Sequence, residues 1–166
     1  MINDSESIGT AVRKNQRQLL VFRLEGQGYA LYLSVVEKVV RAAEITPLPK
    51  APEVVLGVIN WMGRVVPVVD LRARFRFPSR EIDLADRLIF ARTAKRLVAL
   101  LADAVDGVLS SAGEDVVAPD RIVPGLEYVE GVVKIADGLV LIHDLDKFLS
   151  LDEETMLDNA LRGTIR

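Results

Sequence analysis

Short apolar runs separated by turn residues recur along this sequence, and they constrain the fold more than any other feature. Each run is rich in aliphatic residues and ends at a glycine, an Asp-Gly pair or a polar stretch, which is typical of β-strands joined in hairpins. The runs pair along the chain as 19–24 with 29–33, 57–61 with 65–69, 87–91 with 97–101, and 131–135 with 139–143. We therefore expect a mostly β protein.

One of these hairpins occurs twice with the same internal spacing. Gly57-Val58 stands thirteen residues before Asp70-Leu71, and Gly131-Val132 stands the same distance before Asp144-Leu145. Two related β-units are the simplest account, and a chance likeness between two apolar hairpins is the alternative. Curling each small sheet into a barrel would limit its exposed edges.

The pattern divides the chain into three segments. Residues 1–18 contain charges of both signs and no apolar run long enough for a signal peptide or a membrane span, so they are expected to be flexible. Residues 19–149 hold the two β-units, and the polar stretch at 76–86 is the expected seam between them. Residues 150–166 are expected to form a terminal helix and tail.

Two sequence pairs fit a capping box, in which a hydroxyl and a carboxylate each satisfy a free amide at a helix start. Ser34 with Glu37 predicts a single helical turn, and Ser150 with Glu153 predicts the start of the terminal helix. Helical spacing of apolar residues supports that helix at Met156, Leu157, Ala160 and Leu161.

Composition narrows the classes of partner. Half of the residues are hydrophobic and 27% are charged, which is typical of a globular chain. The net charge is −3 with both signs interspersed, so we expect no nucleic-acid partner and no direct insertion into a membrane. The chain has no cysteine, which is compatible with a reducing cytoplasm. A local cationic patch remains open for Lys38, Arg41, Arg64, Arg72, Arg74 and Arg76.

The sequence offers little catalytic chemistry. His143 is the only histidine and stands in an apolar strand, which favours a packed residue over a general base. A metal-dependent hydrolase or transferase stays a remote alternative, because the chain holds four carboxylates in two close pairs, Asp103, Asp106, Asp144 and Asp146. Helix caps account for Asp103 and Asp144 more simply. We therefore expect no catalytic residue, no cofactor and no metal.

The order of these residues resembles the CheW-like coupling domains of bacterial chemotaxis, over about residues 19–149. The resemblance is carried by Val21, Phe22, Tyr29, Val36, Pro47-Leu48-Pro49, Pro52, Gly57-Val58-Ile59-Asn60, Gly63, Pro67-Val68-Val69-Asp70-Leu71-Arg72, Asp103-Ala104-Val105, Pro119, Tyr128, Gly131-Val132 and Asp144-Leu145-Asp146-Lys147. It implies two intertwined SH3-like five-stranded β-barrels around a shared hydrophobic core, with short helices and a C-terminal helix.

The resemblance also implies a function by binding alone. Such a protein is a non-enzymatic, cytoplasmic adaptor that couples the cytoplasmic tips of methyl-accepting chemoreceptors to the regulatory domain of a CheA-type histidine kinase, in receptor arrays at the inner membrane. Carried over by position, the receptor-binding residues are Val36, Lys38, Gly57, Asn60, Trp61, Met62 and Gly63. The kinase-binding residues are Val40, Ala43, Ile45 and Val65.

Two positions depart from the family pattern. The family commonly has an acidic residue at the position of Lys38, and it commonly reads Asn-Leu-Arg-Gly where this chain reads Asn60-Trp61-Met62-Gly63. An opposite-charge pair is lost if those positions touch, so a partner meets a different surface. A related hypothesis is therefore a CheW-like adaptor that recruits a kinase or a CheW-like partner to another polar or motility complex.

Overall fold

The computed structural model describes residues 16–112, 116–117, 128–136 and 138–164. Its strands are β1 (Gln16–Leu24), β2 (Gln27–Tyr32), β3 (Val36–Arg41), β4 (Val55–Trp61), β5 (Arg64–Asp70), β6 (Arg87–Arg92), β7 (Leu97–Ala102), β8 (Ala104–Ala112), β9 (Val116–Val117), β10 (Val129–Ile135) and β11 (Gly138–His143). Its helical segments are η1 (Leu33–Val35), α2 (Leu71–Arg74), η4 (Leu145–Lys147) and α3 (Leu151–Thr164).

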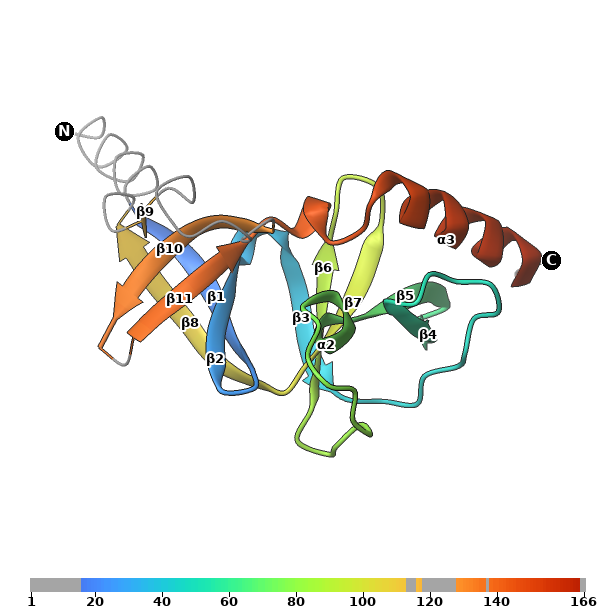
Figure 1. The fold of residues 1–166 in the computed structure, drawn as a ribbon, viewed down its shortest axis with the longest axis horizontal. Helices are drawn as coiled ribbons and strands as arrows, with labels where there is room; N and C mark the ends of the chain where they lie inside the picture. The colour runs from blue at the N-terminus through green and yellow to red at the C-terminus, as the bar shows by residue number, and fades with distance from the viewer. Residues whose placement is uncertain (1–15, 113–115, 118–127, 137, 165–166) are drawn as a thin grey trace.

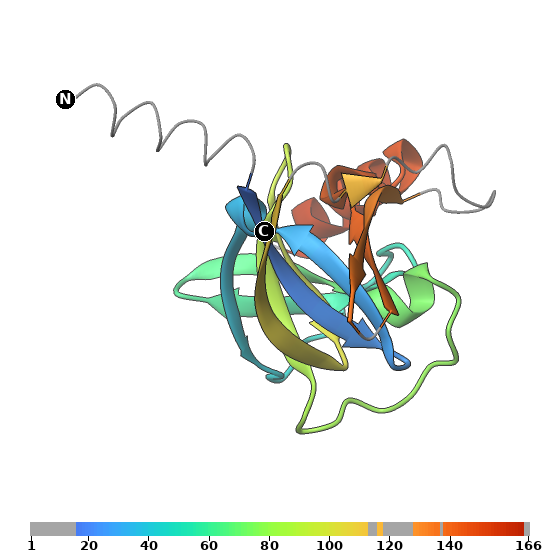
Figure 2. The ribbon, with the colours of Figure 1, turned by 90° about the vertical axis from the view of Figure 1, so that its left-hand side faces the viewer.

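Within these residues the strands form two sheets that lie end to end along the molecule (Figure 1). The first sheet has six strands in the order β8-β1-β2-β11-β10-β9, and the second has five in the order β3-β6-β7-β5-β4. Figure 2 looks onto the first sheet and shows its strands curling around one another. The expected pair of β-barrels is confirmed, and the two-residue β9 adds a strand to the first.

The chain passes from the first sheet to the second and back again. After β2 it enters the second sheet through η1, completes β3 to β7 there, and returns through Asp103 into β8. β8 then pairs with β1 along most of its length, so strands distant in sequence share one ladder. This path explains why the two units are intertwined rather than consecutive.

The internal repeat corresponds to a repeated structural unit. In both copies the hairpin is followed by a helical turn whose N-cap is the repeated aspartate, since the side chains of Asp70 and Asp144 accept from backbone amides two residues ahead. The backbone amide of Asp70 also donates to Val54 O at 2.7 Å, and that of Asp144 donates to Tyr128 O at 2.8 Å. Each second strand pairs in parallel with a strand of its own sheet, β5 with β7 and β11 with β2.

A single apolar core joins the two sheets. Phe22 and Leu31 of the first sheet pack in the same cluster as Ile89 and Leu100 of the second, and all four are fully buried. Phe148, which follows η4, fills the same cluster. The expected shared core is therefore confirmed, and its burial supplies the main force that holds the barrels together.

Helix α3 covers the outside of the second barrel (Figure 1). Leu157 is fully buried and packs with Leu48, Val55 and Val58. The predicted capping box is confirmed, because Ser150 N donates to Glu153 Oε1 at 2.8 Å and Glu153 N donates to Ser150 Oγ at 3.1 Å.

Ion pairs fasten α3 to its neighbours. The Arg74 guanidinium, on α2, contacts both carboxylate oxygens of Glu153 at 2.8 and 2.6 Å. Arg96, in the turn just before β7, pairs with Glu154 at 2.9 Å and with Asp158. The helix is therefore joined to two elements of the second barrel by charge as well as by apolar contact.

Several sequence expectations differ from the structure. Residues 76–86 connect α2 to β6 inside the second sheet, so they are not where the chain passes between the barrels. Residues 16–18 belong to β1 and pair with β8, whereas residues 1–15, Pro119 and Asp137 lie outside the described residues. The prediction of a capping box at Ser34 is wrong, because the N-cap of η1 is Tyr32 and its side chain makes no capping hydrogen bond.

Candidate interaction surfaces

The tip of the β4–β5 hairpin presents one apolar side chain to solvent. Met62 and Gly63 form a two-residue turn with positive φ of 52° and 82°, as the right-handed strand twist favours. Asn60 Oδ1 accepts from Gly63 N at 3.0 Å, so Asn60 and Gly63 shape the turn. Met62 is 86% exposed, and the hairpin projects from the body of the molecule (Figure 2).

Lys38 on β3 and Trp61 on β4 are brought together from the two edge strands of the second sheet. The Lys38 ammonium lies 5.0 Å from the centroid of the Trp61 ring, which is a cation–π distance. The indole also lies 4.8 Å from the ring of the buried Phe90. Trp61 thus contacts the barrel core and holds Lys38 at the surface.

Gly57 allows the chain after β3 to approach β4 closely. Thr46 and Val58 exchange two backbone hydrogen bonds of 2.9 and 2.8 Å, which tie the chain after β3 to β4. A Cβ atom on Gly57 would lie 2.1 Å from Thr46 O, closer than any non-bonded contact allows. Gly57 is buried, so a partner does not meet it directly.

A second apolar surface lies where the two sheets meet. Val36 is half-buried against the shared core, together with Leu33 of η1 and Val105 of β8. Further along β8, Val108 is 55% exposed. Val36 is in the expected receptor-side set, whereas Leu33, Val105 and Val108 are not. The long-range pairing of β8 with β1 brings Val105 opposite Phe22, and no local sequence pattern specifies that pairing.

The expected kinase-side residues are not equally accessible. Val40 and Ile45 are half-buried against the core of the second barrel, whereas Ala43 is exposed. Val65 is 45% exposed and pairs with Asn60 across the β4–β5 hairpin. The structure therefore places Val65 on the same hairpin as the expected receptor-side residues.

The four carboxylates of the remote enzymatic alternative do not come together. Asp103 accepts from Arg72 at 3.0 and 2.7 Å and from Arg80 at 2.9 Å, and Asp106 pairs with Arg23 at 2.6 Å. Within the described part of the chain, no group of three or more acidic or histidine side chains is placed to hold a metal ion. Asp144 and Asp146 each accept from a backbone amide, that of Asp146 and that of Ala94.

Asp103 joins both barrels through this ion-pair network. Besides the two arginines, it accepts from the backbone amide of Glu25 in the β1–β2 turn at 3.0 Å. Desolvation disfavours its charge, but the hydrogen bonds from Arg72 and from that amide outweigh the desolvation and lower the pKa of the Asp103 carboxyl. Arg72 also pairs with Glu25 at 2.5 Å, so the turn of the first barrel is tied to α2 of the second.

His143 is packed in the shared core, as its apolar strand predicted. Its ring lies 4.7 Å from that of Phe75 and 5.1 Å from that of Tyr29. Neither ring nitrogen has a hydrogen-bond partner among the described residues. Burial lowers the pKa of His143 to about 3, so the imidazole is neutral at physiological pH.

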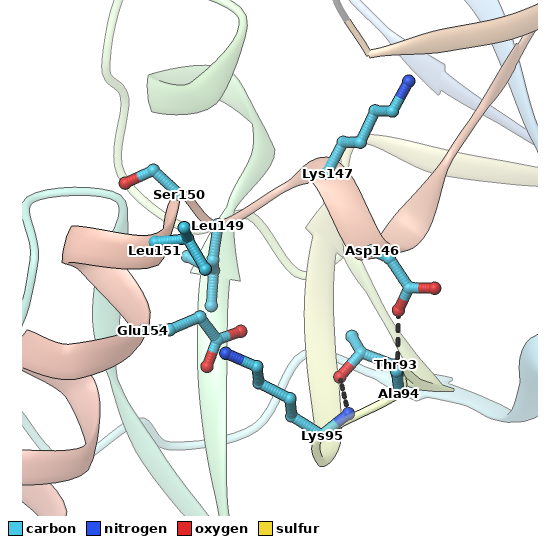
Figure 3. Close-up of a pocket in the computed structure, with 9 residues that line it drawn as sticks. All are labelled: Thr93, Ala94, Lys95, Asp146, Lys147, Leu149, Ser150, Leu151 and Glu154. Carbon is cyan, nitrogen blue, oxygen red and sulfur yellow. Dashed lines mark hydrogen bonds between the residues drawn. The ribbon is translucent and has the colours of Figure 1, made fainter.

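A pocket of about 380 Å³ lies between the β6–β7 turn, η4 and the first turn of α3 (Figure 3). Asp146 reaches across it and accepts from Ala94 N at 2.8 Å. The other charged lining residues are Lys95, Lys147 and Glu154. Both signs of charge and the two leucines 149 and 151 line it, so the pocket favours no single charged ligand.

In the part of the chain that the structure describes, no helix is both long enough and apolar enough to span a bilayer.

Comparison with known proteins places this geometry in a family. The model of the CheW-like domain matches residues 18–153. The chemotaxis protein CheW of Rhizobium meliloti is 32% identical over 139 residues, covering 82% of this chain and 90% of the relative. The chemotaxis protein CheW of Thermotoga maritima is 32% identical over 132 residues, covering 80% and 87%.

A solved structure agrees with both sequence comparisons. The crystal structure of the scaffolding protein TtCheW from Thermoanaerobacter tengcongensis superposes with a TM-score of 0.76 at 28% identity. The match covers 82% of this chain and 94% of that one. With its two intertwined barrels, shared core and family match over most of its length, this chain belongs to the CheW-like domain family.

Proposed function

We propose that the protein is an adaptor that couples chemoreceptor cytoplasmic tips to a CheA-type histidine kinase. Membership of a scaffold family supports this role, and so do relatives named as chemotaxis proteins. The observation that carries it is the pair of apolar surfaces at the hairpin tip and at the junction of the sheets, each on a rigid β framework. Exposed apolar side chains held in this way are typical of protein docking sites.

The adaptor acts without catalysis. Asp103 and Glu153 are each engaged by an arginine and by a backbone amide. His143 lies in an aromatic cluster, and neither of its ring nitrogens has a hydrogen-bond partner among the described residues. Binding, rather than turnover, is the activity that this arrangement supports.

The receptor tip is proposed to dock on the exposed members of the receptor-side set. Val36 contributes an apolar contact at the junction of the sheets, and Met62 contributes another at the hairpin tip. Lys38 and Trp61 form the polar and aromatic border. Asn60, Gly57 and Gly63 act indirectly, because they keep the hairpin in shape.

The kinase regulatory domain is proposed to dock on the second barrel. Ala43 is exposed and Val65 is partly exposed, so these two supply direct contacts. Val40 and Ile45 lie behind them and set the shape of that surface. The protein works in the cytoplasm and reaches receptor arrays at the inner membrane through these partners.

Separate binding measurements test this function. The full chain is titrated by calorimetry with a receptor cytoplasmic fragment and, independently, with a kinase regulatory domain. We expect binding to both partners. Binding to neither would reject the proposal, and binding to the kinase alone would favour an adaptor of a different complex.

Two surface variants assign the docking sites. Met62→Glu is expected to weaken receptor binding and leave kinase binding unchanged, because Met62 is at the hairpin tip. Ala43→Glu is expected to weaken kinase binding and leave receptor binding unchanged, since it places a charge in the proposed kinase-docking surface. If each variant weakened both partners equally, the assignment of the two surfaces would be wrong.

A further inference from the structure

We propose that the surface formed by Lys38, Met62 and Arg64 recognises a receptor segment in which a carboxylate lies beside an apolar side chain. Lys38 and Arg64 would meet the carboxylate, and Met62 would enter the apolar contact. This inference rests on the proposed function and names the chemistry of its receptor partner.

The apolar half of the surface is held in place by the backbone. Met62 occupies the first position of a turn that the Asn60–Gly63 hydrogen bond closes. A flexible thioether on a rigid turn adapts to an irregular apolar partner at little ordering cost.

The charged half is cationic and unpaired. Lys38 and Arg64 are exposed, and within the described residues neither forms an ion pair. The nearest acidic residue along β3 is Glu37, which is already paired with Arg92 at 2.9 Å. This surface is therefore locally positive, although the whole chain carries a net charge of −3.

Trp61 restricts where the Lys38 ammonium can lie. Its indole is fixed between the buried Phe90 and the Lys38 ammonium, so it limits the conformations of a side chain that is otherwise flexible. A cation–π contact does not neutralise the ammonium. Trp61 and Arg64 are direct partners across the hairpin, so their side chains lie on the same face of it.

Charge complementarity defines the partner. A segment with a carboxylate within one helical turn of an apolar residue can reach Lys38 or Arg64 while its apolar side chain contacts Met62. Attraction of this kind raises the association rate and weakens as salt screens it. A purely apolar partner would show no such salt dependence.

Calorimetry of the full chain with a receptor cytoplasmic fragment tests the inference. We expect Lys38→Glu to weaken binding about tenfold at low salt, and we expect the difference from the unmodified protein to shrink at high salt. Lys134→Glu makes the same charge change at an exposed site on β10 of the first barrel, and we expect it to leave binding unchanged. Circular dichroism verifies that both variants are folded.

A charge swap identifies the partner group. Each acidic residue of the receptor tip is replaced in turn by lysine, and one of these variants is expected to bind Lys38→Glu more tightly than it binds the unmodified protein. If Lys38→Glu binds like Lys134→Glu, or no swap restores binding, this inference is overturned while the proposed function stands. If the unmodified protein does not bind the receptor fragment, both are rejected.

Discussion

His143 occupies in the second hairpin unit the position that Val69 occupies in the first. Val69 pairs with Val55 across β4–β5, and His143 pairs with Val129 across β10–β11. Both side chains belong to buried positions. The His143 imidazole is buried in an aromatic cluster without a hydrogen-bond partner among the described residues. Burial of such a polar group lowers the free energy of unfolding relative to an apolar side chain such as the valine at the matching position.

The neutral state of this buried imidazole predicts a pH dependence of stability. The folded-state pKa is lowered to about 3, whereas an unfolded histidine titrates near about 6.5. Between these values the unfolded chain binds the extra proton, so the free energy of unfolding falls as pH drops below about 6.5. We expect this loss between about pH 7 and pH 5, where most carboxyls stay ionised, and we expect His143→Val to remove most of it.

Urea denaturation at a series of pH values measures this difference. The unmodified protein should lose up to about 1.4 kcal/mol per pH unit through this group alone. Parallel curves for the two proteins would contradict the assignment of the effect to His143.

At the scale of elements, the sequence predicted hairpins better than it predicted their partners. Alternating apolar runs and glycine turns are local signals, and the four expected hairpins all form. The pairing of β8 with β1, and the parallel pairing of β5 with β7, join segments whose contact no local pattern specifies.

The two capping boxes show the same limit on a smaller scale. Ser150 and Glu153 are followed by a helix long enough to retain the cap. Ser34 lies inside a three-residue helical turn, and Glu37 belongs to β3, where it pairs with Arg92. A capping motif therefore predicts a helix only where the following residues sustain one.

Helix α3 should be held mainly by its buried face. Leu157 is fully buried, so we expect Leu157→Ala to lower the free energy of unfolding by about 2–5 kcal/mol. Its neighbour Met156 is 46% exposed, so Met156→Ala should change that free energy by about 0.5 kcal/mol or less. Chemical denaturation followed by circular dichroism compares the two, and equal losses would show that α3 is not packed as described.

At the scale of the whole molecule, the sequence favoured two related β-units, with a chance likeness as the alternative, and it placed the passage between them wrongly. The polar stretch at 76–86 looks like a linker because it is rich in charge and contains Pro78. In the structure, charged residues of this stretch form ion pairs: Arg80 pairs with Asp86 at 2.6 Å and with Asp103 at 2.9 Å. The polar composition therefore marks a partly buried ion-pair network here, not a boundary.

The network around Asp103 predicts how firmly the barrels are joined. Asp103→Asn leaves Arg72 with less compensation at a site where that side chain is 10% exposed, so we expect a loss of about 1.5–3 kcal/mol in the free energy of unfolding. Asp106→Asn breaks a more exposed pair, whose side chains are 30% and 41% exposed, and should cost about 0–1 kcal/mol. Thermal denaturation of both variants checks the order, and a larger loss in Asp106→Asn would contradict it.

The candidate surfaces followed from the sequence only through the family resemblance. Composition and periodicity do not reveal that Lys38 lies on Trp61, or that Gly57 faces Thr46 O, because these contacts arise when the second barrel closes. The exposed Met62 shows the same dependence, since its exposure comes from the turn geometry and not from its residue type.

The central claim is that the protein couples a receptor to a kinase by binding both. Its most direct test is autophosphorylation of a CheA-type kinase reconstituted with receptor, with and without the full chain. Receptor control of the kinase should appear only when the chain is present, and it should be lost in Met62→Glu. Equal receptor control in its absence, or no effect of adding it, would contradict the account.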